Sequence, residues 1–102
     1  MDINFFDEST ENFIAALDAV TIAKVLRTLD LLEEFGYKLG MPHSKNIDTN
    51  LFELRIRGKK EVRIMYCFHN NAIILLTACI KKSQKLPIRA VKLAKKRLHS
   101  LD

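Results

Sequence analysis

The chain has little of what marks membrane or secreted proteins. Among its 102 residues, the longest apolar run without a charged side chain is nine residues, from Ala72 to Ile80. A membrane-spanning helix needs about 20 apolar residues, so an integral membrane protein is excluded. The chain starts with Met-Asp-Ile-Asn, which is acidic and lacks the apolar segment of a secretory signal.

Cysteine and histidine are also scarce. The only cysteines, Cys67 and Cys79, each lie in an apolar run, which predicts buried thiols in a reducing compartment rather than a disulfide framework. The three histidines are widely scattered, so the spacing of a metal site is absent. We therefore expect a cytoplasmic protein without a metal or another cofactor.

Acidic residues are nearly absent from the second half. Residues 55–102 contain two acidic and thirteen basic side chains, whereas residues 1–54 contain ten acidic and four basic ones. Such a segment produces a local positive field that attracts phosphate polyanions. The alternative interpretation is a basic surface that only aids solubility. No helix rich in Trp and Phe accompanies the charge, so the pattern does not favour a membrane surface.

The composition, with 48% hydrophobic and 28% charged residues, is typical of one folded domain spanning residues 1–102. Two N-terminal helices are predicted. Asp7 or Ser9 can cap the first helix and Asp18 or Thr21 the second, while Gly36 can end the second helix. Their apolar stripes have helical spacing and contain Phe13, Ile14, Leu17 and Val20, then Ile22, Val25, Leu26, Leu29 and Leu32.

Strand-like runs fill the middle of the chain. Residues 2–6 are a candidate short strand, and residues 40–50 are rich in turn-forming residues and are predicted to be a loop. Leu51–Arg57 and Glu61–His69 alternate between apolar and polar side chains, and Ala72–Ile80 is apolar throughout, as in a central strand.

Short turns join these runs into an antiparallel meander. Asn70-Asn71 suits a tight turn with positive φ, and Pro87 suits the first turn of a last, basic helix. The predicted fold is α+β. Two N-terminal helices pack on a curved antiparallel sheet of three to four strands, followed by a basic C-terminal helix.

The alternation places arginines together on one face of this sheet. The apolar face must meet the two helices, so the opposite face carries Arg55, Arg57 and Arg63. Lys81, Lys82 and Lys85 leave the third strand nearby. Guanidinium and ammonium groups bind phosphate oxygens and can stabilise a phosphorane transition state. Alternatively, Arg55 and Arg63 each pair with Glu53, and the lysines form a solvated strand end.

Three stretches together resemble the RelE/ParE toxin superfamily, and most closely its phage-derived, HigB-like branch. They are Leu51-Phe52-Glu53-Leu54-Arg55, Val62-Arg63-Ile64-Met65-Tyr66-Cys67-Phe68 and Ile80-Lys81-Lys82-Ser83-Gln84-Lys85-Leu86-Pro87, preceded by Pro42-His43-Ser44-Lys45. The resemblance implies the toxin of a type II toxin–antitoxin system. Such a toxin cleaves mRNA in the ribosomal A site without a metal, and the attacking ribose 2′-OH leaves a 2′,3′-cyclic phosphate.

The resemblance also implies roles for individual residues. Arg55 and Arg63 hold the scissile phosphate, and Lys81 or Lys82 stabilises the transition state or moves a proton. The residues implied to contact flanking phosphates or ribosomal RNA are Lys45, Arg57 and Lys85. The implied partners are the ribosome, mRNA and a helix-turn-helix, HigA-like antitoxin, through which alone the toxin reaches operator DNA.

Two other functions are compatible with the same residues. One is a ParE-like toxin that poisons DNA gyrase and has no nuclease activity. The other is a phage protein that binds nucleic acid without chemistry. A cationic set facing a phosphate favours the nuclease, because a gyrase poison needs no catalytic residues.

Overall fold

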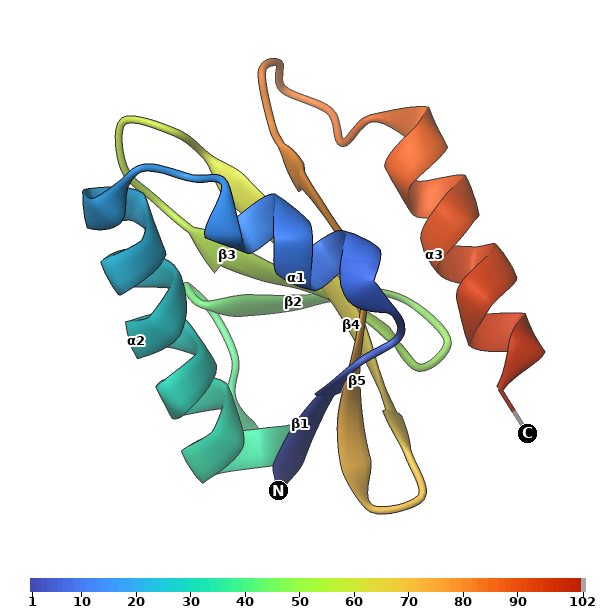
Figure 1. The fold of residues 1–102 in the computed structure, drawn as a ribbon. Coiled ribbons are helices and arrows are strands. Elements are labelled where there is room, and N and C mark those ends of the chain that lie inside the picture. The colour runs from blue at the N-terminus through green and yellow to red at the C-terminus, as the bar shows by residue number, and fades with distance from the viewer. Residues whose placement is uncertain (102) are drawn as a thin grey trace.

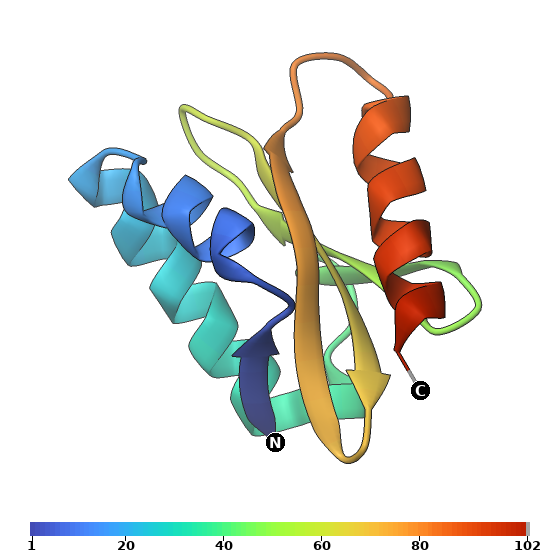
Figure 2. The same ribbon diagram turned by 45° about the vertical axis from the view of Figure 1, so that its right-hand side comes forward.

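The computed structural model describes residues 1–101. In chain order its elements are β1 (Asp2–Phe5), α1 (Glu8–Ala15), α2 (Ala19–Phe35), a 3₁₀ turn (Gly36–Lys38), β2 (Ser44–Asp48), β3 (Leu51–Ile56), β4 (Val62–His69), β5 (Ala72–Ile80) and α3 (Ile88–Ser100). They stack in three layers, with the sheet in the middle, α1 and α2 on one face and α3 on the other (Figures 1 and 2).

The sheet has five strands in the order β1-β5-β4-β3-β2. The two predicted hairpins are present, since β3 pairs with β4 and β4 with β5 in antiparallel fashion. Asn70 and Asn71 form the turn between β4 and β5 with φ of 51° and 61°, which confirms the predicted turn. The α+β class is thereby confirmed.

Three details of the predicted fold are wrong. The sheet has more than the expected three to four strands, because Ser44–Asp48 form β2 where a loop was predicted. The sheet is mixed and not antiparallel, because β1 pairs with β5 in parallel. The C-terminal helix packs on the sheet face opposite α1 and α2, and it covers part of the face that was predicted to carry the arginines.

Aspartates cap the two N-terminal helices. Asp7 accepts a hydrogen bond from the backbone N–H of Ser9 at 2.9 Å, and Asp18 accepts one from that of Thr21 at 3.1 Å. The first candidate of each predicted pair is therefore the cap. Hydrogen bonds from the Thr21 hydroxyl and N–H lower the pKa of Asp18 from 3.8 to about 2.

We expect this cap to contribute to acid unfolding. The folded-state pKa of Asp18 lies below its unfolded value. Its contribution to the free energy of unfolding is therefore complete above pH 3.8 and is lost as the pH falls through about 2. The Asp18→Asn variant lacks this titration. Urea unfolding of both proteins across this pH window is expected to show a steeper loss of stability in the wild type; parallel pH profiles would contradict the prediction.

Two apolar clusters lie on the two faces of the sheet. On the α1/α2 face, alternate residues of β3 and β4 pack with Val25 and Leu32 of α2; the strand residues are Leu54, Ile56, Val62, Ile64 and Tyr66. On the other face, Ala90 and Ala94 of α3 pack on Leu51, Met65, Cys67 and Leu76. Because these four apolar residues occupy the middle of the face, α3 covers that part and leaves the strand ends near Arg63 to the charged side chains.

Arg97 fixes α3 to the rest of the protein. Its guanidinium donates to the Leu76 carbonyl at 2.7 Å, pairs with Asp7 at 3.2 Å and lies 5.0 Å from the centre of the Phe6 ring. The register between β4 and β5 skips Leu76, so the arginine satisfies a carbonyl that the bulge leaves outside the regular ladder.

No helix among residues 1–101 has the length and apolar character to cross a membrane.

Cys67 and Cys79 are free thiols with different exposure. Burial raises the pKa of Cys67 to about 11, and burial followed by the nearby Glu53 carboxylate raises that of Cys79. Because the thiolate is the nucleophile, we expect iodoacetamide to leave Cys67 of the native protein unmodified and to label the half-buried Cys79 slowly. Intact-mass spectrometry in the absence and presence of urea would check this; rapid native labelling of Cys67 would contradict it.

Candidate nucleic-acid interface

The register of the sheet brings the predicted basic residues together. Arg55 of β3 lies opposite Arg63 of β4, which lies opposite Cys79 of β5. In the next row Lys45 of β2 lies opposite Glu53 of β3. Since side chains alternate between the faces of a sheet, these residues share the face on which α3 packs.

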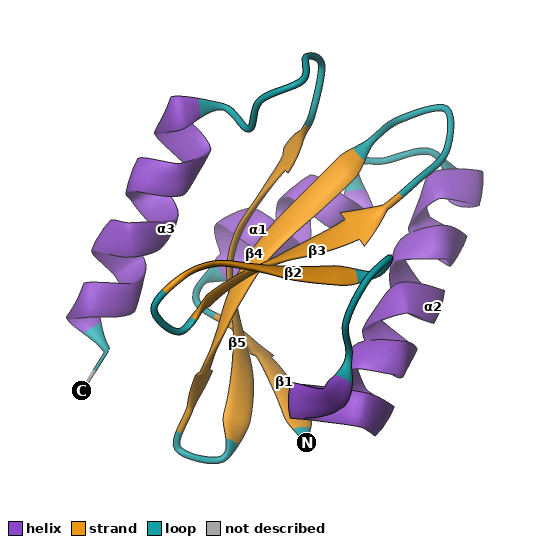
Figure 3. Cartoon of the chain, turned by 180° about the vertical axis from the view of Figure 1, so that it is seen from behind, coloured by secondary structure: helices purple, strands orange, loops and turns teal. Residues whose placement is uncertain are grey.

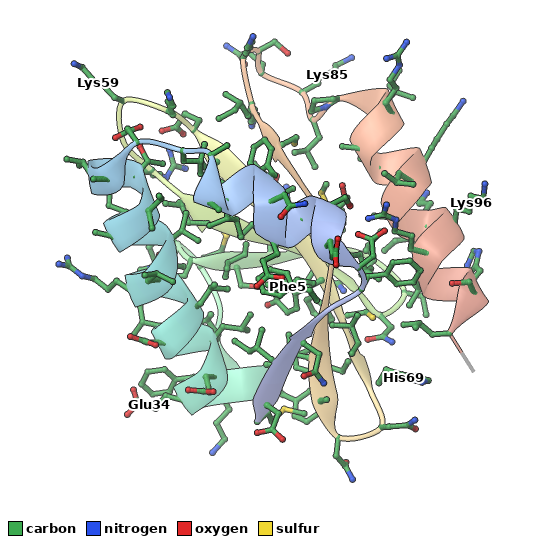
Figure 4. The ribbon with its side chains drawn as sticks, in the orientation of Figure 1. Phe5, Glu34, Lys59, His69, Lys85 and Lys96 are labelled. Atoms are coloured by element: carbon green, nitrogen blue, oxygen red, sulfur yellow. The ribbon has the colours of Figure 1, made fainter. Side chains whose placement is uncertain are left out.

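The turn after β3 and the loop after β5 extend this surface. Both lie at the same end of the sheet (Figures 1 and 3), and the Lys81 N–H donates to the Glu61 carbonyl at 2.7 Å. We call residues 55–63 and 81–85 the basic end. Figure 4 shows Lys59 and Lys85 projecting from its two sides.

A buried carboxylate lies in the middle of this surface. Glu53 accepts a hydrogen bond from Arg55 Nε at 2.8 Å, and its other oxygen lies 3.5 Å from Arg63 Nε. The side chains of Glu53 and Arg63 are each 3% exposed, and that of Arg55 is 13% exposed. Both arginines therefore pair with Glu53, which is the alternative that the sequence left open.

Arg63 has further partners at and just before the start of its own strand. Its guanidinium lies 3.2 Å from Glu61 Oε1 and donates to the Val62 carbonyl at 3.1 Å, whereas its buried Nε makes no hydrogen bond. The Gly58 N–H, and after it the Arg63 guanidinium, lower the pKa of the Glu61 carboxyl. Arg63 is thus part of an ion-pair network inside the protein, away from solvent.

The other predicted cations are accessible. Lys45, Lys82 and Lys85 are exposed and Lys81 is half-buried. Arg57 is 62% exposed and lies 3.8 Å from Glu61, which is a loose ion pair. These side chains can reach a bound phosphate, whereas Arg63 can act on one only through its neighbours.

Sequence reasoning did not identify Glu53 as the centre of the site. Its signal was present, because a glutamate between Phe52 and Leu54 in an alternating strand shares a face with two arginines. The Glu53 carboxylate orients both guanidinium groups, and together with Glu61 it balances their two charges. Within residues 1–101, no cluster of three or more His, Cys, Asp or Glu side chains could hold a metal ion.

One family model, described as "Phage derived protein Gp49-like", matches residues 12–99. The chain belongs to this family. The Gp49-like family is part of the RelE/ParE-like toxin superfamily, so the resemblance is confirmed at that level. No curated protein matches the chain.

The match to the Gp49-like family includes the whole basic end, all of α2 and the second half of α1. The surface therefore belongs to the family domain itself. Its exposed ammonium groups and one exposed guanidinium surround the buried ion pairs of Glu53, a charge distribution that attracts polyanions. Such groups stabilise negative charge that grows on a phosphate.

Proposed function

We propose that this Gp49-like protein is the toxin of a type II toxin–antitoxin system, of the HigB-like branch, and that it cleaves mRNA on the ribosome in the cytoplasm. The observation that carries this proposal is the basic end. Arg55 of β3 and Arg63 of β4 pair there with the buried Glu53 carboxylate, and the cations of the β3–β4 turn and of the loop after β5 lie at the same end of the sheet. A protein that only docks on another protein needs no such arrangement.

The proposed reaction is an internal transfer within the RNA. The ribose 2′-oxygen gives its proton to solvent water and forms a bond to the adjacent phosphorus, while the bond from phosphorus to the 5′-oxygen breaks and that oxygen gains a proton. The products are a 2′,3′-cyclic phosphate and a 5′-hydroxyl. Negative charge rises on the phosphate oxygens in the transition state, where fixed cations stabilise it most.

In this proposal the accessible and buried cations have different roles. Lys81 and Lys82 contact the scissile phosphate, and an ammonium there can donate a proton to the leaving 5′-oxygen. Arg55 uses its Nε for Glu53, and its terminal nitrogens have no carboxylate partner in the described chain, so they can bind a phosphate oxygen. Arg63 is a positioning residue that holds Glu53 and, through it, Arg55.

Lys45, Arg57 and Lys85 are exposed around this centre. We propose that they contact the phosphates on either side of the cleaved bond or the ribosomal RNA. Each such contact releases counterions, so binding falls as salt rises.

The proposed partner is a helix-turn-helix antitoxin, which would carry the toxin to operator DNA. Exposed apolar side chains on and after α2 suit such a partner, because water contact with them is unfavourable. They are Val20, Leu26, Phe35 and Tyr37, between 47% and 68% exposed. The antitoxin would bury these side chains under apolar residues of its own and place acidic residues against the basic end.

Cell-free translation of a defined mRNA with the purified protein, mapped by primer extension, tests the proposal. We expect discrete cuts in phase with codons when ribosomes are present and none on naked mRNA. Uncut mRNA and normal translation would contradict it. A gyrase supercoiling assay on the same protein would then test the gyrase-poison alternative.

A further inference from the structure

A second cationic surface lies beside the basic end, at the edge of the sheet. A hollow of about 280 Å³ opens where β3 extends beyond the start of β2, between α2 and the loop that precedes β2. Its cations are Lys24 and Arg27 of α2 and Arg55 and Arg57 of β3 and its turn, with His43 of the loop beside them. We call it the edge pocket.

The edge pocket has a large excess of positive charge. No carboxylate lines it. Lys24 and Arg27 make no salt bridge with any residue that the structure describes, and Arg57 makes only the loose pair with Glu61. Only Arg55 is firmly paired, through its Nε to Glu53. The three cations without a firm partner repel one another, so a bound anion would relieve this repulsion.

The backbone holds the walls of this pocket in place. The Arg55 N–H donates to the His43 carbonyl at 2.8 Å, and the His43 N–H donates to the Gly40 carbonyl at 3.0 Å. A Cβ at Gly58 would lie 2.7 Å from Lys24 Nζ, so this ammonium lies directly against the β3–β4 turn. The cations therefore come from elements that are fixed relative to one another.

We infer that the edge pocket binds a phosphate group of a single-stranded RNA backbone. Arginine forks and a lysine ammonium are the groups that bind phosphate oxygens in proteins. The inference deepens the proposed function and rests on it for the identity of the ligand as RNA. RNA is favoured over an acidic peptide because Arg55 and Arg57 belong to both surfaces, so one polyanion can run from the pocket into the basic end.

The pocket therefore extends the RNA path from the α3 side of the sheet, around the edge of β3, to α2. The acidic first half of the chain supplies two cations to this path. Lys24 and Arg27 are one helical turn apart, so they face the same side of α2.

The test uses the full-length protein and a fluorescently labelled, short single-stranded RNA, without ribosomes. Binding anisotropy is measured over a range of salt concentrations for the wild type and for Lys24→Gln/Arg27→Gln. We expect this variant to bind more weakly, with a slope of log K against log salt smaller by about 0.7, since the pocket holds one phosphate and each phosphate contact contributes about 0.7 for single strands. Thermal unfolding checks that the variant is folded.

The matched control is Lys92→Gln/Lys96→Gln, which removes the same charge from exposed positions of α3. Figure 4 shows Lys96 pointing away from the sheet. An unchanged slope in this control supports the inference, whereas equal slopes in the two variants would overturn it. If polyglutamate shifts the amide NMR signals of His43 and Gly58 but RNA does not, the pocket is a protein-docking site and the inference is overturned.

The two proposals can fail separately. If the wild type does not cleave mRNA on ribosomes but the pocket variant still loses salt dependence, the nuclease proposal fails and the pocket stands. If the wild type cleaves mRNA and the pocket variant keeps the wild-type slope, only the inference about the pocket fails.

Discussion

Replacing Arg63 with methionine is expected to lower the free energy of unfolding by about 3–5 kcal/mol, because it removes one partner of a buried ion pair. Glu53, whose side chain is 3% exposed, would then keep Arg55 as its only cationic partner. The Val62 carbonyl would also lose a donor. Urea denaturation followed by circular dichroism measures the effect.

Arg57→Met is the matched control for this prediction. Like Arg63, Arg57 lies near Glu61, but its side chain is 62% exposed and its guanidinium is 3.8 Å from the carboxylate. Exposed ion pairs contribute about 0–1 kcal/mol, so this variant should unfold almost like the wild type. Equal unfolding midpoints for Arg63→Met and Arg57→Met would contradict the network that we describe.

A double-mutant cycle separates the pair from the general cost of substitution. Glu53→Gln removes the charge at the centre, and Glu53→Gln/Arg63→Met removes both partners. Residues in one ion-pair network do not act additively, so we expect the double variant to lose less stability than the two single variants together. The cycle matters for function as well, because loss of cleavage in an unstable Arg63 variant would say nothing about catalysis.

Local patterns were enough to predict the hairpins. Asn70 and Asn71 adopt the positive φ that their residue type tolerates, and β4 and β5 begin and end within one residue of their predicted bounds. These features depend on neighbouring residues only. The stripe of α2 was less informative, since Val25 and Leu32 are buried but Leu26 is 54% exposed. The apolar stripe of α2 is wider than the part of the helix that packs on the sheet.

The edge strands depend on distant residues and were harder to predict. Ser44–Asp48 is polar, yet it forms β2 because β3 offers its free edge to a segment that follows α2. A strand with one solvent-facing edge needs few apolar residues. In the same way β1 was recognised as a short strand, but its parallel pairing with β5 joins segments far apart in the chain, which local patterns do not reveal.

The sequence predicted which residues form the site better than it predicted how deeply each of them is buried. Alternation correctly placed Arg55 and Arg63 on one face of the sheet, but alternation says nothing of what covers that face. Arg63 is buried and paired with Glu53 and Glu61, whereas the lysines are more accessible. The contribution of Arg27 to the edge pocket had no sequence signal, because it comes from a helix in the acidic half of the chain.

The accessible lysines are therefore the cleanest test of the proposed chemistry. We expect Lys81→Met/Lys82→Met to cleave ribosome-bound mRNA about 10²–10³-fold more slowly than the wild type, the usual cost of removing a group that stabilises transition-state charge. Lys82 is exposed and Lys81 half-buried, so the fold should survive. Single-turnover primer extension with excess toxin gives the rate.

Lys92→Met/Lys96→Met controls for the loss of two positive charges, because both residues are exposed on α3 and neither lies at the basic end. If the reaction depends only on the overall attraction of a basic protein to the ribosome, both double variants slow it equally, and the catalytic role of Lys81 and Lys82 is wrong. If only the first variant is slow, and saturating toxin does not restore its rate, the loss lies in the chemical step. The two ammonium groups then act on the phosphate itself.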